Sequence, residues 1–348
     1  MYHIFNYKQK FQLESGRFLP EFQLTYTTLG KLNASKSNVV WITHALTANS
    51  NPEEWWSGLV GEDKIFNPEK YFIICANVLG SPYGSTNPLS INPDTGNKYY
   101  HNFPEITIRD IVKALDLLRQ YLRIEKIHTL LGGSLGGQQA VEWAIQQPEF
   151  IQNLFLIATN AQHSPWGIAF NESQRLAIKA DRTWFSYSDD AGLKGMKAAR
   201  AIALLSYRNY QTYKATQQDE HEKVADFKAV SYQNYQGEKL VNRFNAFSYW
   251  YLSKAMDSHN VGRIRGGIEA ALARIKANTL VVAIDSDLLF PVCESKILAE
   301  GINNCQLSVV NSLYGHDGFL IETQQLATLF KNFYTTQQLK KEIYEYTN

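Results

Sequence analysis

Cysteine, excess charge and long apolar runs are all scarce in this sequence, and each scarcity excludes a class of protein. Its 348 residues include only three cysteines, Cys75, Cys293 and Cys305, too few and too scattered for a disulfide framework or a zinc site. Lysine and arginine total 34 against 33 aspartate and glutamate, a net charge of +1, so nothing favours binding to nucleic acid or to an anionic membrane surface. No apolar stretch approaches the length of a transmembrane helix, and the first residues do not resemble a signal peptide. We therefore expect a cytoplasmic protein that needs no metal.

What is present is a regular alternation of strand-like and helix-like segments. Short apolar runs typical of strands buried on both faces alternate with apolar residues at helical spacing. The predicted strands cover residues 38–43, 71–76, 126–131 and 153–158, and the predicted helices begin near Thr107 and Gln139. Such alternation is typical of an α/β fold with a doubly wound, mostly parallel sheet.

This alternation of predicted strands and helices is interrupted in the second half of the chain. From about residue 161 to residue 276 there is no convincing buried strand, only polar, aromatic-rich stretches with helical character. The strand pattern returns at residues 279–284 and 307–310. We interpret residues 161–276 as a helical cap inserted into a core domain that is formed by residues 1–160 and 277–348.

The segment Gly132-Gly133-Ser134-Leu135-Gly136 contains the G-x-S-x-G pattern of a nucleophile elbow. The pattern alone is weak evidence, but here a predicted strand precedes it and a predicted helix follows. A strand, a tight glycine turn and a helix together raise a serine hydroxyl above the end of a parallel sheet. We therefore predict that Ser134 is a catalytic nucleophile.

A serine hydroxyl needs a neighbouring base, and the base needs an orienting acid. In hydrolases of this architecture the order along the chain is serine, acid, histidine. Asp285 and Asp287 follow one late strand, and His316 follows the last one. Asp285 could instead be a turn-forming residue, so Asp287 is the favoured acid. Of the eight histidines, His316 best fits the position of the base, whereas His44 is expected to shape its own loop.

Acyl chemistry also needs N–H donors for the oxyanion that forms on the carbonyl group. In an elbow of this type one donor is the residue after the nucleophile, here Leu135. The second comes from a loop after an early strand. The loop His44-Ala45-Leu46-Thr47 has that place in the sequence, and we select Leu46 as the second donor.

With these residues identified, the chain resembles the homoserine O-acetyltransferase family of α/β-hydrolase-fold enzymes along nearly its whole length. The resemblance rests on a set of stretches in a fixed order: Thr43-His44-Ala45-Leu46-Thr47, Asn77-Val78-Leu79-Gly80, the elbow, Ile168-Ala169-Phe170-Asn171, Ala199-Arg200 with Tyr207, Ser286-Asp287 with Phe290-Pro291, and Gly315-His316-Asp317-Gly318. The chain departs from the family at Ser81-Pro82-Tyr83 and Ala48-Asn49, which we expect at the mouth of the site.

The resemblance implies a triad of Ser134, Asp287 and His316. It also implies that Arg200 and Asp317 bind an amino acid, because a guanidinium can pair with its carboxylate and a carboxylate with its ammonium group. Tyr207, seven residues after Arg200, could line the same pocket.

The implied reaction is transfer of an acetyl group from acetyl-CoA to L-homoserine through an acyl-serine, for methionine synthesis. Acetyl-CoA would be a co-substrate, and no cofactor is implied. The family usually forms homodimers through the cap. Three alternatives stay open: a succinyl donor, a serine acceptor, or a plain esterase that uses water.

Overall fold

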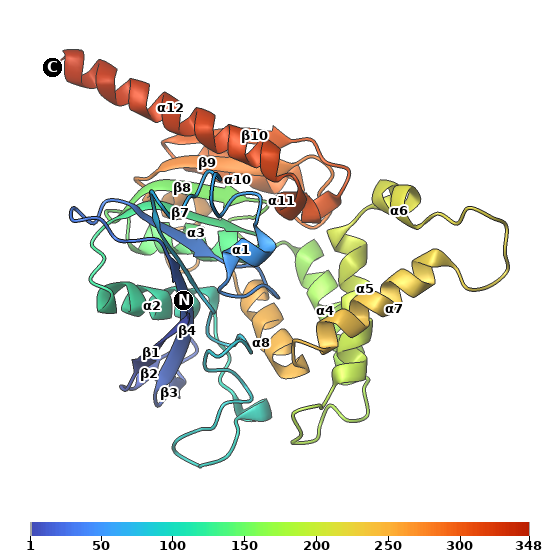
Figure 1. The fold of residues 1–348 in the computed structure, drawn as a ribbon. Helices are drawn as coiled ribbons and strands as arrows, with labels where there is room; N and C mark the ends of the chain where they lie inside the picture. The colour runs from blue at the N-terminus through green and yellow to red at the C-terminus, as the bar shows by residue number, and fades with distance from the viewer. Residues whose placement is uncertain (1, 348) are drawn as a thin grey trace.

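A single large sheet forms the centre of the molecule (Figure 1). The computed structural model describes residues 2–347, and for residue 341 and residues 343–347 it describes the backbone alone. The eight strands lie in the order β1-β4-β6-β5-β7-β8-β9-β10. Their bounds are Tyr2–Tyr7 (β1), Phe22–Leu29 (β4), Val39–Thr43 (β5), Phe72–Ala76 (β6), Ile127–Gly133 (β7), Ile151–Ile157 (β8), Asn278–Ile284 (β9) and Cys305–Val310 (β10). A small separate sheet pairs β2 (Phe11–Gln12) with β3 (Phe18–Leu19).

Strand direction explains where a site can form. In the sheet order from β6 to β10 all neighbouring strands run parallel, whereas β4 pairs antiparallel with both β1 and β6. Every residue of β5 is buried, as expected for an apolar strand covered on both faces. Because β5, β7, β9 and β10 are parallel, the loops that follow them emerge at one edge of the sheet, where ligands of such folds bind. The predicted mostly parallel α/β sheet is thus confirmed.

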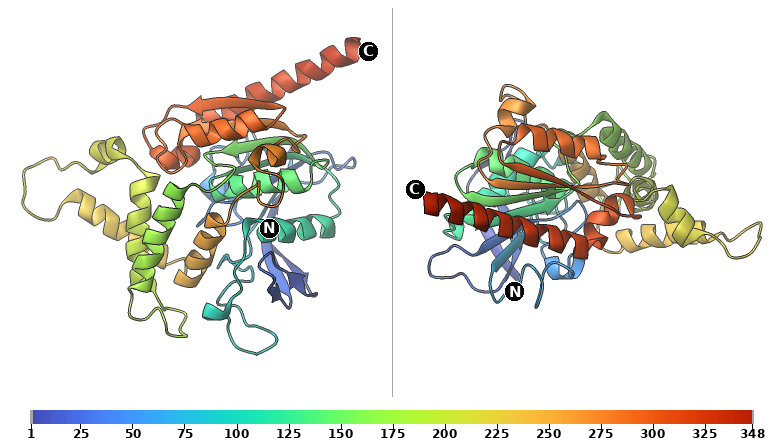
Figure 2. Two further views of the ribbon diagram at one scale, coloured as in Figure 1. Left: turned by 180° about the vertical axis from the view of Figure 1, so that it is seen from behind. Right: turned by 90° about the horizontal axis from the view of Figure 1, so that it is seen from above.

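Helices cover both faces of the sheet (Figure 2). One core cluster joins the sheet to α2 (Ile108–Tyr121), α3 (Leu135–Gln146) and α10 (Val292–Gly301). A second cluster joins the opposite face to α12 (Thr323–Thr347) and to the segment around α1 (Pro52–Trp55). The remaining short helical turns outside the inserted segment are η1 (Tyr100–Asn102), η2 (Gly315–Asp317) and α11 (Gly318–Ile321). In the part of the chain that the structure describes, no helix is both long and apolar enough to cross a membrane.

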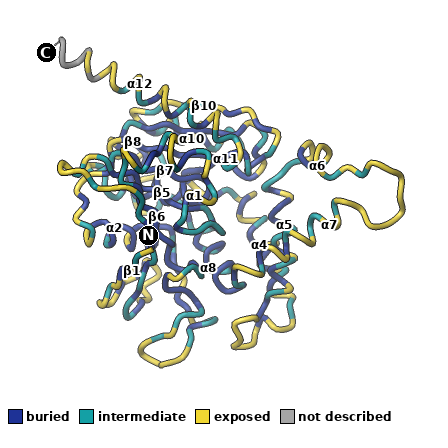
Figure 3. The backbone as a smooth tube through the Cα atoms, viewed as in Figure 1, coloured by how far each residue is buried: buried dark blue, intermediate teal, exposed yellow. Residues whose placement is uncertain are grey.

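Between β8 and β9 the chain leaves the sheet and forms a run of helices. These are α4 (Pro165–Lys179), α5 (Leu193–Tyr207), α6 (Tyr210–Gln217), α7 (Lys228–Val241), α8 (Ala246–Asp257) and α9 (Ile268–Leu272). Figure 1 shows α4 to α7 standing to one side of the sheet, and α5 packs against both α4 and α7. The sheet is mostly buried, whereas the loop between α6 and α7 is mostly exposed (Figure 3).

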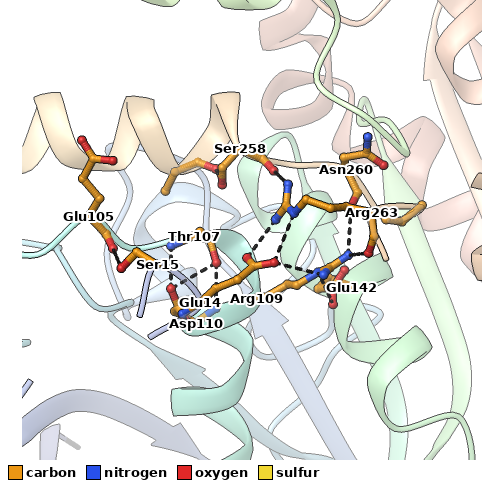
Figure 4. Close-up of polar contacts among 12 residues, drawn as sticks. Glu14, Ser15, Glu105, Thr107, Arg109, Asp110, Glu142, Ser258, Asn260 and Arg263 are labelled. Carbon is orange, nitrogen blue, oxygen red and sulfur yellow. Dashed lines mark hydrogen bonds and ion pairs between the residues drawn. The ribbon is translucent and has the colours of Figure 1, made fainter. Parts of the chain in front are cut away.

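An ion-pair network ties the end of this helical segment back to the sheet domain (Figure 4). Arg263 pairs with Glu14 at 2.8 Å, and Arg265 pairs with Glu142 of α3. Arg109 of α2 joins the two pairs, because its guanidinium lies 3.0 Å from Glu14 and 3.6 Å from Glu142. Glu142 is nearly fully buried, so removing one of its cationic partners would leave a costly buried charge.

Candidate active site

The turn between β7 and α3 places Ser134 in a backbone conformation that side chains rarely adopt. Its φ is +59° and its ψ is −127°. The neighbouring glycines have no space for a side chain. A Cβ on Gly132 would lie 2.3 Å from Thr43 Oγ1, and one on Gly136 would lie 2.1 Å from the Thr43 carbonyl oxygen. The glycines therefore let α3 and the segment after β5 approach each other, which is the strained turn expected of an elbow.

Ser134, His316 and Asp287 form one hydrogen-bonded chain. His316 Nε2 lies 2.9 Å from Ser134 Oγ, and His316 Nδ1 lies 2.6 Å from Asp287 Oδ2. The other carboxylate oxygen of Asp287 accepts backbone N–H bonds from Leu289 at 2.8 Å and Phe290 at 2.9 Å. All three triad residues are buried, with at most 6% of their surface exposed. The geometry is that of a nucleophile, a base and an orienting acid.

Asp285, the alternative acid, does not contact His316 and instead forms hydrogen bonds between two loops. Its Oδ1 accepts a hydrogen bond from the Ser312 N–H at 2.9 Å, and its own N–H donates to the Val310 carbonyl group. These bonds join the loops after β9 and β10, which carry Asp287 and His316. The structure therefore brings Asp287, and not Asp285, to the histidine.

The two predicted oxyanion donors lie close to the nucleophile, one next to it in the chain and one in the same cavity. Leu135 is the first residue of α3, so its N–H has no acceptor within the helix and sits at the positive end of the helix dipole. Leu46 is buried in the loop after β5 and lines the same cavity as Ser134.

A cavity of about 560 Å³ opens above Ser134 and His316. The floor comes from the sheet domain and the opposite wall from the helices inserted between β8 and β9. Its lining residues are Ala45, Leu46, Thr47, Ala48, Asn49, Glu54, Trp55, Tyr83, Ser134, Arg200, Tyr207, Lys239, Arg243, His316, Asp317, Phe319 and Leu320. Three of them, Ala48, Asn49 and Tyr83, belong to the stretches that depart from the family pattern.

Arg200, Tyr207 and Asp317 all reach this cavity. The Arg200 guanidinium lies over the Tyr207 ring, 5.4 Å from its centroid, and both side chains line the cavity. The Tyr207 ring also lies 5.7 Å from the His316 ring. Burial raises the pKa of the Asp317 carboxyl above its ordinary value, while the guanidinium groups of Arg208 and Arg200 act in the opposite direction.

Two arginines at the site were not predicted from the sequence. Arg208 Nε forms an ion pair with Asp317 Oδ2 at 2.8 Å. Arg243 donates to the Thr47 carbonyl oxygen and to the Tyr83 hydroxyl, each at 2.5 Å. Arg208 follows Tyr207 directly, which could have suggested it, but Arg243 lies in a helix connection whose direction the sequence does not reveal. Within the described residues, no group of three or more His, Cys, Asp or Glu side chains is placed to hold a metal ion.

Comparison with known proteins places this geometry in a family. A family model described as the alpha/beta hydrolase fold matches residues 38–323. The homoserine O-acetyltransferase of Cyclobacterium marinum is 54% identical over 331 residues, covering 95% of this chain and 94% of the relative. The structure of homoserine O-acetyltransferase from Bacillus anthracis matches with a TM-score of 0.88 at 26% identity, covering 96% of this chain and 97% of that one. Esterase E22 matches with a TM-score of 0.86 at 25% identity, covering 96% and 99%. The chain therefore belongs to the homoserine O-acetyltransferase family of α/β-hydrolase-fold enzymes.

Proposed function

We propose that the protein transfers the acetyl group of acetyl-CoA to the side-chain hydroxyl of L-homoserine, in two half-reactions. The observation that carries the proposal is the hydrogen-bonded chain from Asp287 through His316 to Ser134, which ends in a cavity that also contains Arg200 and Asp317. The product, O-acetyl-L-homoserine, would enter methionine synthesis.

In the first half-reaction Ser134 Oγ attacks the thioester carbonyl carbon while His316 Nε2 takes the hydroxyl proton. The negative charge that develops on the carbonyl oxygen is met by the N–H groups of Leu46 and Leu135. The carbon–sulfur bond then breaks, the His316 proton passes to the leaving sulfur, and CoA departs as a thiol. Asp287 keeps the imidazole oriented and stabilises its charged form.

In the second half-reaction the homoserine hydroxyl takes the place of the serine hydroxyl. His316 removes its proton, its oxygen attacks the acyl-serine carbonyl carbon, and the proton returns to Ser134 Oγ as that bond breaks. Asp317 would hold the ammonium group and Arg200 the carboxylate of the amino acid. Because Arg208 already pairs with Asp317, the carboxylate is held in place before the acceptor arrives.

The wall opposite Ser134 supports transfer over hydrolysis. We propose that residues 161–276 act as a cap over residues 1–160 and 277–348, and that the cap excludes water from the acyl-serine. Homodimerisation through this cap and a cytoplasmic location remain predictions. The solved esterase with the same fold makes hydrolysis the second candidate, and a succinyl donor or a serine acceptor would use the same triad.

Mass spectrometry of the intact protein tests this proposal. Incubation with acetyl-CoA alone is expected to add one acetyl group, located on Ser134 by peptide mapping. Addition of L-homoserine is expected to discharge it rapidly, whereas L-serine or buffer discharges it slowly. Loading by succinyl-CoA in place of acetyl-CoA would identify the other donor.

The control is Ser134→Ala, which keeps the fold but lacks the nucleophile and should acquire no acetyl group. Discharge in buffer as fast as with L-homoserine would identify an esterase. Full transfer activity in Ser134→Ala would overturn the mechanism.

A further inference from the structure

His44, directly after β5, is fully buried and both of its ring nitrogens contact the backbone. His44 Nδ1 lies 2.9 Å from the Ala45 carbonyl oxygen, and His44 Nε2 lies 3.1 Å from the Val78 nitrogen. His44 itself does not line the cavity, whereas the next two residues do. It therefore contacts the site only through its neighbours.

These two contacts fix the protonation of the ring. A backbone N–H can only donate, so Nε2 must accept from Val78 and carries no proton. The proton of the neutral ring is then on Nδ1, which donates to the Ala45 carbonyl oxygen. Burial lowers the pKa of the His44 imidazole to about 4, so this neutral form persists at neutral pH.

The accepting carbonyl group belongs to the same peptide unit as the Leu46 N–H. A trans peptide is planar, and its C=O and N–H point in opposite directions. The Ala45 oxygen also accepts from the Ala48 N–H at 3.0 Å. Two donors thus hold the carbonyl end of this peptide unit, which determines the direction of its N–H.

We propose that His44 is a positioning residue that fixes the Ala45–Leu46 peptide so that the Leu46 N–H faces the reacting carbonyl oxygen. The inference rests on the proposed acyl-serine chemistry and gives this histidine a part in it. Without the Nδ1–H donor only the Ala48 N–H holds the Ala45 carbonyl oxygen, so the peptide rotates more easily. A rotated peptide would present its carbonyl oxygen to the developing negative charge.

Gln139 links the two segments that carry the proposed oxyanion donors. Its buried side-chain Nε2 donates at 3.1 Å to the His44 carbonyl oxygen and at 3.1 Å to the Leu135 carbonyl oxygen. The loop that carries Leu46 and the first turn of α3 are therefore joined by one amide. With His44 orienting one donor and α3 the other, the site is organised before substrate binds, as electrostatic stabilisation requires.

Two substitutions test the roles of the two ring nitrogens separately. The amide nitrogen of His44→Asn has the position of Nδ1, so this variant keeps the donor to Ala45 and loses the acceptor for Val78. The longer His44→Gln can place its amide oxygen near Nε2, so it keeps the acceptor and loses the donor. If the bond to Ala45 is what matters, His44→Asn should keep the acylation rate and His44→Gln should lose it, although the two side chains are similar in size and polarity.

The experiment measures the rate of acylation of Ser134 by p-nitrophenyl acetate, which needs no amino acid acceptor. Wild-type protein that is not acylated would refute the proposed function itself. With acylation established, we expect His44→Gln to be slower by about 100-fold, in the range found when an oxyanion donor is lost. We expect His44→Asn to stay within about tenfold of the wild type.

A second readout separates positioning from loss of folded protein. A trifluoromethyl ketone forms a tetrahedral adduct on the serine, so its inhibition constant depends on the oxyanion donors. That constant should rise in His44→Gln by a factor similar to the loss in rate, while KM for the ester changes little. Equal rates in His44→Gln and the wild type would overturn the proposal, as would a folded His44→Asn that loses as much activity as His44→Gln.

Discussion

In the proposed reaction Asp317 is the carboxylate that binds the ammonium group of the amino acid. It follows the catalytic histidine directly, forms an ion pair with Arg208, and faces the cavity that contains Arg200. Replacing it with asparagine removes the negative charge but nearly preserves the shape. A hydrogen bond to a charged group contributes about 1.5–3 kcal/mol, so the loss should appear mainly in acceptor binding.

For Asp317→Asn we expect KM for L-homoserine to rise by roughly 10- to 100-fold, with a much smaller change in the rate of Ser134 acylation. Steady-state transfer and p-nitrophenyl acetate bursts measure the two quantities. Asp189→Asn is a suitable control, because that carboxylate forms an exposed pair with Lys98. Equal losses in both half-reactions would show that Asp317 does not act on the acceptor.

The ion pair between Arg208 and Asp317 predicts how the activity depends on pH. The positive charge of Arg208 lowers the pKa of the Asp317 carboxyl, against the effect of burial. In Arg208→Leu that pKa should therefore rise, so the carboxyl is protonated at a higher pH. We expect the acid limb of kcat/KM for L-homoserine to move to higher pH, measured from pH 5 to 8. An unshifted limb would mean that Asp317 does not need its charge to bind the acceptor.

Single residues were also the most predictable part of the site. Ser134, Asp287 and His316 could be found because each follows a strand and their order along the chain is fixed by the fold. Arg208 and Arg243 could not, since their roles depend on how the inserted helices lie over the sheet. No periodicity in the sequence encodes that direction.

At the scale of elements, the elbow depends on the contact between α3 and the end of β5. Gly136→Ala would place a methyl group 2.1 Å from the Thr43 carbonyl oxygen, and backbone atoms cannot easily yield. The helix would have to move away from the loop that carries Leu46. We expect a loss of stability despite the better helix propensity of alanine, together with a large loss of acylation rate.

Thermal unfolding and ester bursts measure the two effects of Gly136→Ala. Gly237→Ala is the control for the acylation rate, because a Cβ there would also be crowded, 2.6 Å from Lys197 Cγ and 3.1 Å from the Lys197 carbonyl oxygen, but within α7 and not at the elbow. A Gly136→Ala protein that is acylated as fast as the Gly237→Ala protein would show that the close contact at the elbow is not needed.

The elements themselves were predicted unevenly. The buried strands β5 to β9 stand out as apolar runs, because both of their faces are covered. The edge strand β1 is only partly buried, with a single buried residue, Phe5, so its sequence lacks that signal. The order β4-β6-β5-β7 likewise follows from long-range pairing, about which a local pattern carries no information.

At the scale of the whole molecule, three buried histidines link stability to pH. Burial lowers the pKa of His44 to about 4 and those of His163 and His259 to about 3. In the unfolded chain their pKa is near the ordinary value of about 6.5. Between these values the unfolded state binds more protons, so the contribution of these residues to stability is present above pH 6.5 and is lost as the pH falls toward 4.

His259→Gln tests this linkage. His259 Nε2 donates to the Asn160 carbonyl oxygen at 3.0 Å, a bond that a glutamine amide can replace without titrating. Between pH 7.5 and 5.5 we expect the free energy of unfolding of the variant to fall by about 1.4 kcal/mol less than that of the wild type. Urea unfolding at the two pH values measures the difference, and parallel losses would contradict the assignment.

The cavity over Ser134 has a consequence for the yield of the proposed reaction. In that reaction, any water molecule in the cavity could hydrolyse the acetyl group on the serine. Hydrolysis would therefore compete with transfer to the amino acid. If L-homoserine were scarce, the acyl-serine would persist for longer and a larger share of the acetyl-CoA would be hydrolysed without product. The yield of the proposed transfer, and not only its rate, would then depend on how well the helices above the sheet exclude water from the acyl-serine.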